Sequence, residues 1–547
     1  MAASAGVLLA LVGAPLAMLA WQSVSDKQGL TLDGYTAVVG RSLYYQSLIN
    51  TLEVGIGSAA LSVLIGAPLA WFVARTDMPR RGLVRTLVTA SYVAPPFLLA
   101  IAYVILMAPN TGALNRAIVA LTGVERGPFN AYSLGILIFV TGLHTFPAVF
   151  LLTVAALESL DGSLEQAARI LGAGKLRTTL KITLPLVLPS VLGGALLAFV
   201  TAIALFGSQA ILGIPGRVYT LPTRVYQVLG YPPDYTLASA LSMLLVALTV
   251  IALALQRRWV GRRVATIGAR TTPAEPLGLG RWRWLALAAS ALVILVAIVL
   301  PYGALGAVSL MRAWPAGLVA ANLTLDNYAQ VLFGLEVTRR AIGNSLLLGA
   351  LTATITMVLG VVIATIDLRT ALRGKRVLDY LSVIPLGVPG IVLAVAILEL
   401  WLRLPVNLYG TLAILLLAYL TRFVPLAVRS SQAAISQVDT SLEEAARIGG
   451  ASWWTTERRV TLPLAAPALV AGWILVFVPT LQELSASVLL FTPDTMTLAV
   501  TIFNFQDNGK LELVSALGVV MLVLVTFLVA LTRRFAGRPV VPSVRGV

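Results

Sequence analysis

The sequence of 547 residues contains no cysteine and a single histidine, His144. Without cysteine there is no disulfide, no thiolate metal ligand and no cysteine nucleophile. With one histidine, a metal site built from several histidines of this chain is excluded. A phosphate-binding loop is missing as well, because the Gly-Lys pairs at 174–175 and 374–375 do not continue into the pattern G-x4-G-K-[ST]. We therefore expect no cofactor, no metal and no nucleotide site in this chain, and no enzymatic activity of its own.

Charged residues are scarce too. Asp, Glu, Lys and Arg make up 11% of the chain, whereas 58% of the residues are apolar and apolar runs of about 20 residues recur. This composition predicts an all-α polytopic membrane protein with about twelve transmembrane helices. The expected spans lie at roughly 5–21, 53–74, 86–107, 133–157, 186–206, 236–256, 284–311, 345–366, 381–402, 409–431, 464–482 and 513–532.

The first of these segments has an alternative interpretation. It is short and ends in small residues at 17–20, so it could be a secretory signal peptide. However, no Lys or Arg precedes it, and an even number of spans gives both halves of the chain the same orientation. We therefore expect it to be retained as a span.

Positive charge is unevenly distributed along the chain. The net charge of +16 would suggest a nucleic-acid partner in a soluble protein, but Lys and Arg also accumulate in the cytoplasmic loops of membrane proteins. Of the 39 basic residues, 26 lie in segments that the span count places on one side, including 257–283 and the C-terminal tail. Both termini and the linker are therefore expected to be cytoplasmic, and no nucleic-acid partner is needed to explain the charge.

A forty-residue stretch occurs twice in the chain. Residues 161–200 and 439–478 align at a constant offset of 278 without a gap, and 20 of the forty positions are identical. The pattern Thr-Leu-Asp-x-Tyr at 31–35 and 324–328 extends the duplication toward the start of each half. With six spans in each copy, the two copies share one orientation, which predicts two parallel six-helix repeats.

The duplication also sets the expected domain boundaries. The first unit should comprise residues 1–256 and the second unit residues 284–547. The linker between them, 257–283, is rich in Pro and Gly at its centre and is expected to be flexible. Each unit contains one polar loop between spans, at 158–185 and 436–463.

The repeated loop carries a motif with a fixed spacing. Glu-Ala-Ala at 444–446 is followed after three residues by Gly450 and after nine more by Val-Thr-Leu-Pro at 460–463. This pattern resembles the Glu-Ala-Ala loop, EAA-x3-G-x9-I-x-LP, of the permease subunits of ATP-binding cassette (ABC) importers. The first copy fits the same pattern with Gln166 in place of the first glutamate.

The resemblance implies that each loop forms a short coupling helix that docks in a groove of a cytoplasmic ATPase. A rigid helix held by a glycine turn could pass a push from such a partner into the following span, because packed helices move as bodies. The alternative is an interfacial helix that lies on the lipid headgroups. The residues expected to serve coupling are Glu165, Gln166, Ala167, Ala168, Gly172, Glu443, Glu444, Ala445, Ala446 and Gly450.

Over the whole chain, including 386–398 and 483–509, the sequence resembles the ferric iron importer permeases, within a group that also serves polyamines, thiamine and phosphonates. The resemblance implies a bacterial inner-membrane protein that works with two cytoplasmic ATPase subunits, which bind ATP and Mg, and with a periplasmic or lipid-anchored substrate-binding protein. A secondary transporter is the alternative class, but it would not explain two coupling loops. A membrane enzyme would need a nucleophile, a metal cluster or paired carboxylates, and none is found.

Few polar residues lie inside the expected spans. A charge near the bilayer centre costs roughly 3 kcal/mol, so such residues usually face a cavity or a partner. Arg422 lies near the middle of the tenth span, and the offset of 278 aligns it with His144. Further candidates are Gln482 and Glu483, expected at the outer end of the eleventh span, and Glu399, near the outer end of the ninth.

Two interpretations of these residues stay open. As parts of a substrate path, Arg422 would suit an anionic ferric complex, whereas Glu483 and Glu399 would suit a cationic thiamine or polyamine. As structural residues, Arg422 would snorkel, cap carbonyls freed by the nearby proline, or form an ion pair with Glu483, and His144 would be an ordinary buried histidine. Because no cluster of carboxylates, tyrosines or histidines could hold a bare ferric ion, we expect a passage and not a high-affinity site.

Overall fold

The computed structural model describes residues 1–26, 28–260, 276–406 and 408–536. These residues are almost entirely helical, and their one strand pair is a two-residue hairpin, β1 (Ser25–Asp26) with β2 (Gly29–Leu30). An all-helical fold follows from the composition, because a chain that crosses hydrocarbon must satisfy its backbone polar groups internally. The expected all-α fold of two parallel six-helix repeats is confirmed.

Among the described residues, ten helices are long and apolar enough to cross a membrane, and two bent helix pairs bring the number to twelve. In the first unit they are α1–α2 (Ala2–Gln22), α4 (Ser42–Arg75), α5 (Arg81–Ser91) with α6 (Pro96–Met107), α8 (Leu134–Ser159), α11 with its preceding turn (Thr179–Ala204) and α14 (Tyr235–Val260). In the second unit they are α15–α16 (Trp282–Ser309), α18 (Glu336–Arg369), α19 (Lys375–Val383) with α20 (Gly390–Arg403), α21 (Leu412–Ser436), α23–α24 (Trp453–Leu481) and α27 (Leu511–Ala536).

Shorter helices connect or flank these spans. In the first unit they are α3 (Asp33–Gly40), α7 (Ala113–Thr122), α9 (Ser163–Ile170), α10 (Lys175–Thr178), α12 (Gly207–Gly213) and α13 (Leu221–Val228). In the second unit they are α17 (Asp326–Ala329), α22 (Thr440–Ile448), α25 (Ser487–Leu490) and α26 (Leu498–Asp507). α9 and α22 fall within the two repeated loops.

The third and ninth spans differ from the expected continuous segments, because each is a broken pair. α5 and α6 meet at 100°, and α19 and α20 meet at 111°. Pro95 and Pro389 lie at the two breaks. Each proline directly precedes the second helix of its pair, at a position where its missing N–H costs no helical hydrogen bond.

The expected linker also differs in its bounds. α14 runs to Val260 and α15 begins at Trp282, so both helices extend into the segment 257–283. Residues 261–275 of that segment and residues 537–547 of the tail lie outside the described residues. The domain boundaries proposed from the sequence therefore stay predictions.

Each unit has a core of three crossing helices: α4, α8 and α11 in the first, and α18, α21 and α24 in the second. Glycines allow the closest crossings. A Cβ atom on Gly66 would lie 2.8 Å from the carbonyl oxygen of Phe146, and a Cβ atom on Gly360 would lie 2.8 Å from that of Ala427. Small residues at crossings of this kind let two membrane helices approach backbone to backbone.

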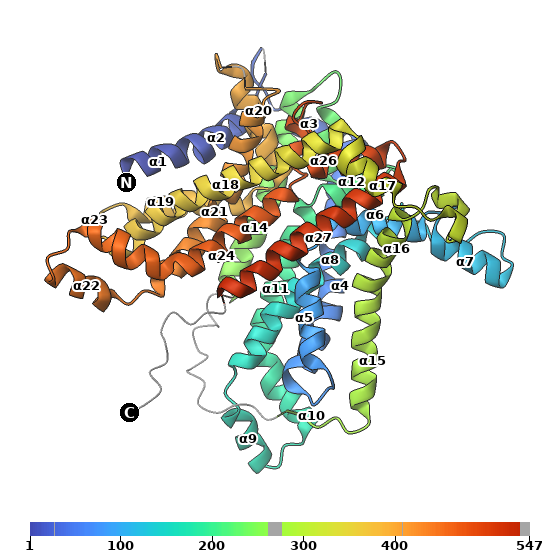
Figure 1. Cartoon of the computed structure of the whole chain (residues 1–547), viewed down its shortest axis with the longest axis horizontal. Coiled ribbons are helices and arrows are strands. Elements are labelled where there is room, and N and C mark those ends of the chain that lie inside the picture. The colour runs from blue at the N-terminus through green and yellow to red at the C-terminus, as the bar shows by residue number, and fades with distance from the viewer. Residues whose placement is uncertain (27, 261–275, 407, 537–547) are drawn as a thin grey trace.

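The first helix of each unit packs on the other unit. α2 lies against α20 of the second unit, while α16 lies against α6 and α15 against α5 of the first unit. Figure 1 shows this exchange, with the blue α1–α2 beside the yellow and orange helices and the yellow-green α15 beside the blue α5. The two units are therefore interlocked and not simply placed side by side.

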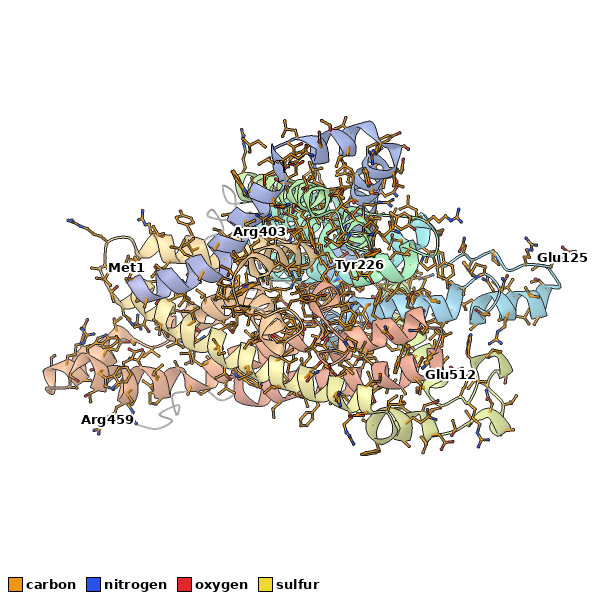
Figure 2. The ribbon with its side chains drawn as sticks, turned by 90° about the horizontal axis from the view of Figure 1, so that it is seen from above. Met1, Glu125, Tyr226, Arg403, Arg459 and Glu512 are labelled. Atoms are coloured by element: carbon orange, nitrogen blue, oxygen red, sulfur yellow. The ribbon has the colours of Figure 1, made fainter. Side chains whose placement is uncertain are left out.

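The repeated loops lie apart from each other. In Figure 1, α9 lies at the bottom of the first unit and α22 lies at the left end of the second unit. In the view from above, Met1 and Arg459, which follows α22, lie toward the same end of the molecule, whereas Glu125 and Glu512 lie toward the other (Figure 2). The N-terminus is thus on the side of the second repeated loop.

Candidate functional site: two loop helices and a central polar cluster

The loop helices α9 and α22 begin with the same cap. The side chain of Asp161 accepts a hydrogen bond from the backbone N–H of Ser163 (3.0 Å), and Asp439 accepts one from Ser441 (2.9 Å). Hydrogen bonds from the Ser441 backbone and side chain lower the pKa of the exposed Asp439 carboxyl. An ionised carboxylate at this position satisfies a free N–H and suits the positive end of the helix.

The same two helices end in one geometry, which explains the spacing of the motif. Gly172 and Gly450 have φ of +79° and +85°, a left-handed conformation that favours glycine. Just beyond them, the N–H of Ala173 donates to the carbonyl of Ala168 (2.9 Å), and that of Ala451 donates to Ala446 (3.0 Å). This is the Schellman arrangement of a helix C-terminus. The glycine at a fixed distance from Glu-Ala-Ala is therefore the residue that stops the helix.

The expected coupling residues fall into two groups. Gln166 and Ala167 in α9, with Glu444 and Ala445 in α22, are exposed and could meet a partner. Ala168 is buried and Ala446 is half-buried against the chain itself. The glutamates that precede the motif, Glu165 and Glu443, point inward, so they do not belong to the exposed surface.

Glu165 and Glu443 each pair with an arginine at the end of a long helix. Arg75, the last residue of α4, places Nη2 3.1 Å from Oε1 of Glu165. Arg369, the last residue of α18, places Nε 2.8 Å from Oε1 of Glu443. Neither ion pair was predicted from the sequence, in which the two arginines count only among the basic residues near span ends. The available signal was their position, since each arginine closes a helix of 34 residues.

The two units differ beside these ion pairs. In the second unit, the buried Glu457 accepts a hydrogen bond from Thr365 (3.3 Å), whereas the offset of 278 places Thr179 at the equivalent position of the first unit. Trp453 and Trp454 are exposed, with ring centroids 6.2 Å apart. The second loop therefore presents more aromatic surface than the first.

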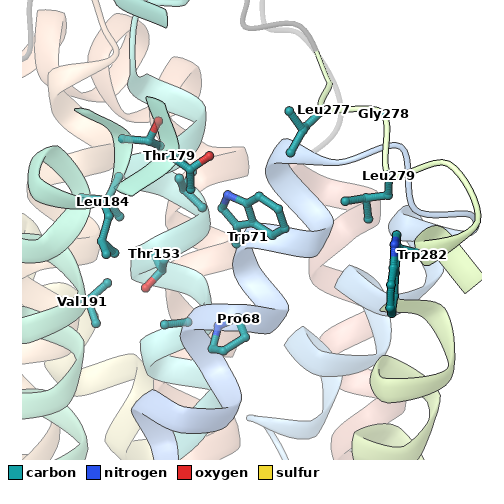
Figure 3. A pocket seen from close by; sticks show the side chains of 14 residues that line it. Pro68, Trp71, Thr153, Thr179, Leu184, Val191, Leu277, Gly278, Leu279 and Trp282 are labelled. Atoms are coloured by element: carbon teal, nitrogen blue, oxygen red, sulfur yellow. The ribbon is translucent and has the colours of Figure 1, made fainter. Parts of the chain in front are cut away.

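A groove lies beside each loop, between the long helix and the helix that follows the loop. In the first unit it has a volume of about 580 Å³, and Figure 3 shows Trp71 of α4 between Thr179 and Leu184 on one side and Leu277 and Leu279 on the other. The groove of the second unit has a volume of about 820 Å³. Both linings are predominantly apolar, so neither groove suits an ionic substrate.

A polar cluster lies where helices of the second unit break. Nε of Arg422, in the middle of α21, lies 2.6 Å from Oε2 of Glu483. Glu483 follows the end of α24, and its other oxygen accepts a hydrogen bond from the N–H of Ala486 (2.9 Å) ahead of α25. A Cβ atom on Gly390, the first residue of α20, would lie 2.7 Å from Nη1 of Arg422. Glu483 therefore lies just beyond the C-terminal end of the eleventh span, where the sequence placed it, and its carboxylate contacts the middle of α21.

The first unit has no arginine–glutamate pair at the positions equivalent to Arg422 and Glu483. His144 replaces Arg422, and its ring stacks on Tyr92 with centroids 6.4 Å apart and planes at 15°. Leu205 takes the place of Glu483. Tyr92 lies in the break between α5 and α6, so His144 contacts the broken span of its unit as Arg422 contacts that of its own.

The broken segments of the two units meet. The side-chain amide of Gln482 donates to the backbone carbonyl of Val93, in the break between α5 and α6 (2.9 Å). A Cβ atom on Gly207, the first residue of α12, would lie 2.8 Å from Phe97 and 2.9 Å from Leu484. Gln482 and Glu483 thus belong to one junction between the units.

Glu399 lies elsewhere. It is nine residues beyond Gly390 on α20, about 13 Å along the helix. Its carboxylate lies 4.0 Å from Nη2 of Arg403, so it has its own cationic partner. Among the described residues, no group of three or more His, Asp or Glu side chains could hold a metal ion. The central junction can accommodate opposite charges, but it provides no cage for a bare cation.

Comparison with known proteins agrees with this architecture. A family model described as "Binding-protein-dependent transport system inner membrane component" matches residues 63–266 and again residues 356–540. Each match contains the loop helix and the broken span of its unit. The two matches together cover more than half of the chain.

Individual relatives span the chain or half of it. The ferric transport system permease protein FbpB of Actinobacillus pleuropneumoniae is 25% identical over 95% of this chain and 76% of its own length. A putative ferric transport system permease protein, FbpB 1 of Haemophilus influenzae, is 26% identical over 86% of this chain and 74% of its own. The molybdenum transport system permease protein ModB of Escherichia coli is 29% identical over 40% of this chain and 93% of its own. The chain belongs to the family of inner-membrane components of binding-protein-dependent transport systems.

Proposed function

We propose that this chain is the transmembrane permease subunit of an ATP-driven importer. A periplasmic or lipid-anchored binding protein delivers the substrate, two cytoplasmic ATPase subunits bind ATP and Mg, and α9 and α22 each dock on one of them. The observation that carries this proposal is the duplicated loop helix. Both copies have the same cap, the same Schellman terminus and an exposed Glu/Gln-Ala surface.

The proposal includes an orientation. Both termini, the linker and both loop helices lie on the cytoplasmic side of a bacterial inner membrane. The distribution of Lys and Arg supports this orientation. The position of Met1 at the same end as the second loop agrees with it (Figure 2).

Ferric iron in a chelated, anionic form is the substrate that we favour. Two relatives that match most of the chain are named ferric transport permeases. Arg422 supplies a positive charge at the junction of the broken helices, and the 2.6 Å contact with Glu483 leaves this charge balanced until a substrate competes for it. Passage of a complexed ion needs no coordination cage in the membrane.

An oxyanion is the second candidate. A relative named for molybdenum transport and others named for 2-aminoethylphosphonate transport match about half of the chain. A phosphonate or oxyanion would use Arg422 in the same way as an anionic ferric complex. Thiamine and polyamines are cations and would instead use Glu483 or Glu399. We rank them lower because the relatives reported above are named for ferric iron, molybdenum and 2-aminoethylphosphonate.

The test is reconstitution. The chain, its ATPase subunits and its binding protein are placed in vesicles, and ATP hydrolysis and uptake are measured with ferric citrate, molybdate, 2-aminoethylphosphonate, thiamine and spermidine. We expect hydrolysis that is stimulated by the loaded binding protein, and ATP-dependent uptake of the ferric complex. Uptake that needs a proton or sodium gradient and no ATP would identify a secondary transporter and refute the proposal.

A further inference from the structure

The loop helices are attached to more than the spans that follow them. We propose that Arg75 and Arg369 are positioning residues that fasten α9 and α22 to the ends of α4 and α18. A displacement of either loop helix is then passed sideways into the long helix of its unit. This inference rests on the proposed function, because it assumes that an ATPase moves the loop helices.

In the second unit, one guanidinium joins three helices. Arg369 belongs to α18, and its Nε lies 2.8 Å from the carboxylate of Glu443 in α22. Its Nη2 donates to the backbone carbonyls of Ile435 (3.1 Å) and Val438 (2.8 Å), at the end of α21. The planar guanidinium is suited to this arrangement because it holds several donors in a fixed geometry. The ends of α18, α21 and α22 are therefore held in one orientation.

The acidic partners add a further attachment. The hydroxyl of Thr461 donates to the same Glu443 oxygen (3.3 Å), and the hydroxyl of Thr183 donates to Glu165 (2.7 Å). Each threonine belongs to the Thr-Leu-Pro sequence that leads into α11 or α24. Each glutamate thus links its loop helix both to the long helix before the loop and to the span after it.

Burial of these ion pairs limits the movement of the loop helices. The side chains of Arg369 and Glu443 are 11% and 7% exposed, and those of Arg75 and Glu165 are 6% and 15% exposed. A buried charge that loses its partner is strongly unfavourable, so the loop helix cannot move away from the arginine at little cost. The sequence suggested a push passed only along the chain into α11 and α24, whereas these contacts also carry it into α4 and α18.

An exposed arginine–glutamate pair beside Arg75 in the first unit provides a control of the same chemistry. Arg85 and Glu158 join α5 to α8 with N–O distances of 2.7 and 3.1 Å, but their side chains are 47% and 41% exposed. Neither residue belongs to a loop helix or contributes to the Arg75–Glu165 pair. Exposed pairs contribute little to stability, so their removal changes local charge without releasing a loop helix.

The experiment uses the assembled transporter and neutralises both members of a pair, so that no buried charge remains alone. We compare Arg369→Gln/Glu443→Gln with Arg85→Gln/Glu158→Gln and measure substrate transported per ATP hydrolysed. Spin labels on Ile448→Cys, in α22, and Leu372→Cys, after α18, report the distance between loop helix and long helix. Both native side chains are exposed, and the chain has no cysteine of its own.

We expect the Arg369→Gln/Glu443→Gln protein to assemble with its ATPase and to hydrolyse ATP, while transport per ATP falls by about tenfold and the label distances spread. The control should stay within about twofold of the unmodified protein in both measurements. Unchanged transport per ATP together with an unchanged distance distribution would overturn the inference.

A second variant keeps the test decisive if the neutral pair does not accumulate. Arg369→Lys keeps the charge beside Glu443, but an ammonium group cannot reproduce the fixed fork of the guanidinium. We expect normal assembly and about threefold lower transport per ATP. Full coupling in Arg369→Lys would also count against the inference. If the unmodified chain shows no stimulated hydrolysis, the proposed function itself fails, and this outcome differs from all the others.

Discussion

The guanidinium of Arg422 and the carboxylate of Glu483 lie 2.6 Å apart in the second unit, and the equivalent positions of the first unit hold His144 and Leu205. The duplication therefore preserved the helix breaks but not their charge. One side of the central junction carries an ion pair, and the other carries a stacked aromatic pair. If the substrate passes between the units as proposed, it meets two different surfaces.

Neutralising Arg422 separates the two interpretations of this pair. Arg422→Gln leaves Glu483 without its cationic partner, and breaking a buried pair commonly costs about 3–5 kcal/mol. Because the Arg422 side chain is 26% exposed, we expect a loss near the lower end of that range. If the pair is structural, Arg422→Gln and Glu483→Gln should each lower thermal stability, and the double variant should recover part of it.

If Arg422 also guides the substrate, transport and stability will respond differently. Arg422→Gln/Glu483→Gln should then remain folded and hydrolyse ATP, while uptake of the ferric complex falls by about tenfold or more. Thermal unfolding and vesicle uptake, measured on the same preparations, distinguish the two roles. Normal stability and normal uptake in all three variants would leave the pair without either role.

The glycines that end the loop helices should be essential for coupling. Gly172→Val and Gly450→Val place β-branched residues in a left-handed conformation, which costs about 1–3 kcal/mol at each site. We expect the combined variant to lose most of its substrate-stimulated ATP hydrolysis while its amount in the membrane is unchanged.

Gly174→Val is a control within the same loop. Gly174 has no positive φ, and a Cβ atom there would meet nothing within 4 Å. Stimulated hydrolysis should therefore be close to normal in this variant. Normal coupling in Gly172→Val/Gly450→Val would show that the helix terminus does not matter.

The orientation can be tested with two cysteines of equal accessibility. Ile448, at the end of α22, and Leu121, in α7, are 89% and 86% exposed. In intact cells an impermeant thiol reagent should label Leu121→Cys, and it should label Ile448→Cys only after the membrane is opened. Labelling of Ile448→Cys from outside would invert the proposed topology.

A methyl group at Gly390, at the start of α20, should disturb the ion pair between Arg422 and Glu483. Gly390→Ala would place a Cβ atom 2.7 Å from Nη1 of Arg422 and 2.9 Å from the Cβ atom of Ser485, so the guanidinium or α20 must shift. Such crowding typically costs about 1–3 kcal/mol, which thermal unfolding would detect. Gly303→Ala, in α16, meets nothing within 4 Å and should keep or raise stability, by up to about 1 kcal/mol.

Sequence patterns predicted the twelve apolar segments and the two loop helices because each is encoded locally. Hydropathy marks a span, and a glycine at a fixed distance marks the end of α9 or α22. The breaks at Pro95 and Pro389 were not predicted, since apolar residues continue through them. A proline alone does not distinguish a break from a kink, as Pro147 and Pro425 lie inside continuous helices. Both breaks contact the other unit, through Gln482 to the carbonyl of Val93 and through Thr249 to the carbonyl of Gly387, and no local pattern indicates such contacts.

The roles of Arg75 and Arg369 could not be read from the sequence for a different reason. Arginines at the ends of spans are common, and their charge alone indicates only the side of the membrane. Their partners, Glu165 and Glu443, lie 90 and 74 residues away in sequence. Contacts at such separations are set by how α4 and α18 cross their neighbours and not by any local pattern.

The exchange of first helices has a consequence for how the chain is made. α2 ends at Gln22, but the helix on which it packs, α20, ends at Arg403. Synthesis at about 5–20 residues per second leaves α2 without this partner for roughly 20 to 80 seconds after it enters the membrane. During biogenesis the first unit therefore cannot complete its assembly alone. A ribosome that stalls between the two units would leave α2 with its contacts to α14 but without the larger surface on α20 that covers it in the finished chain.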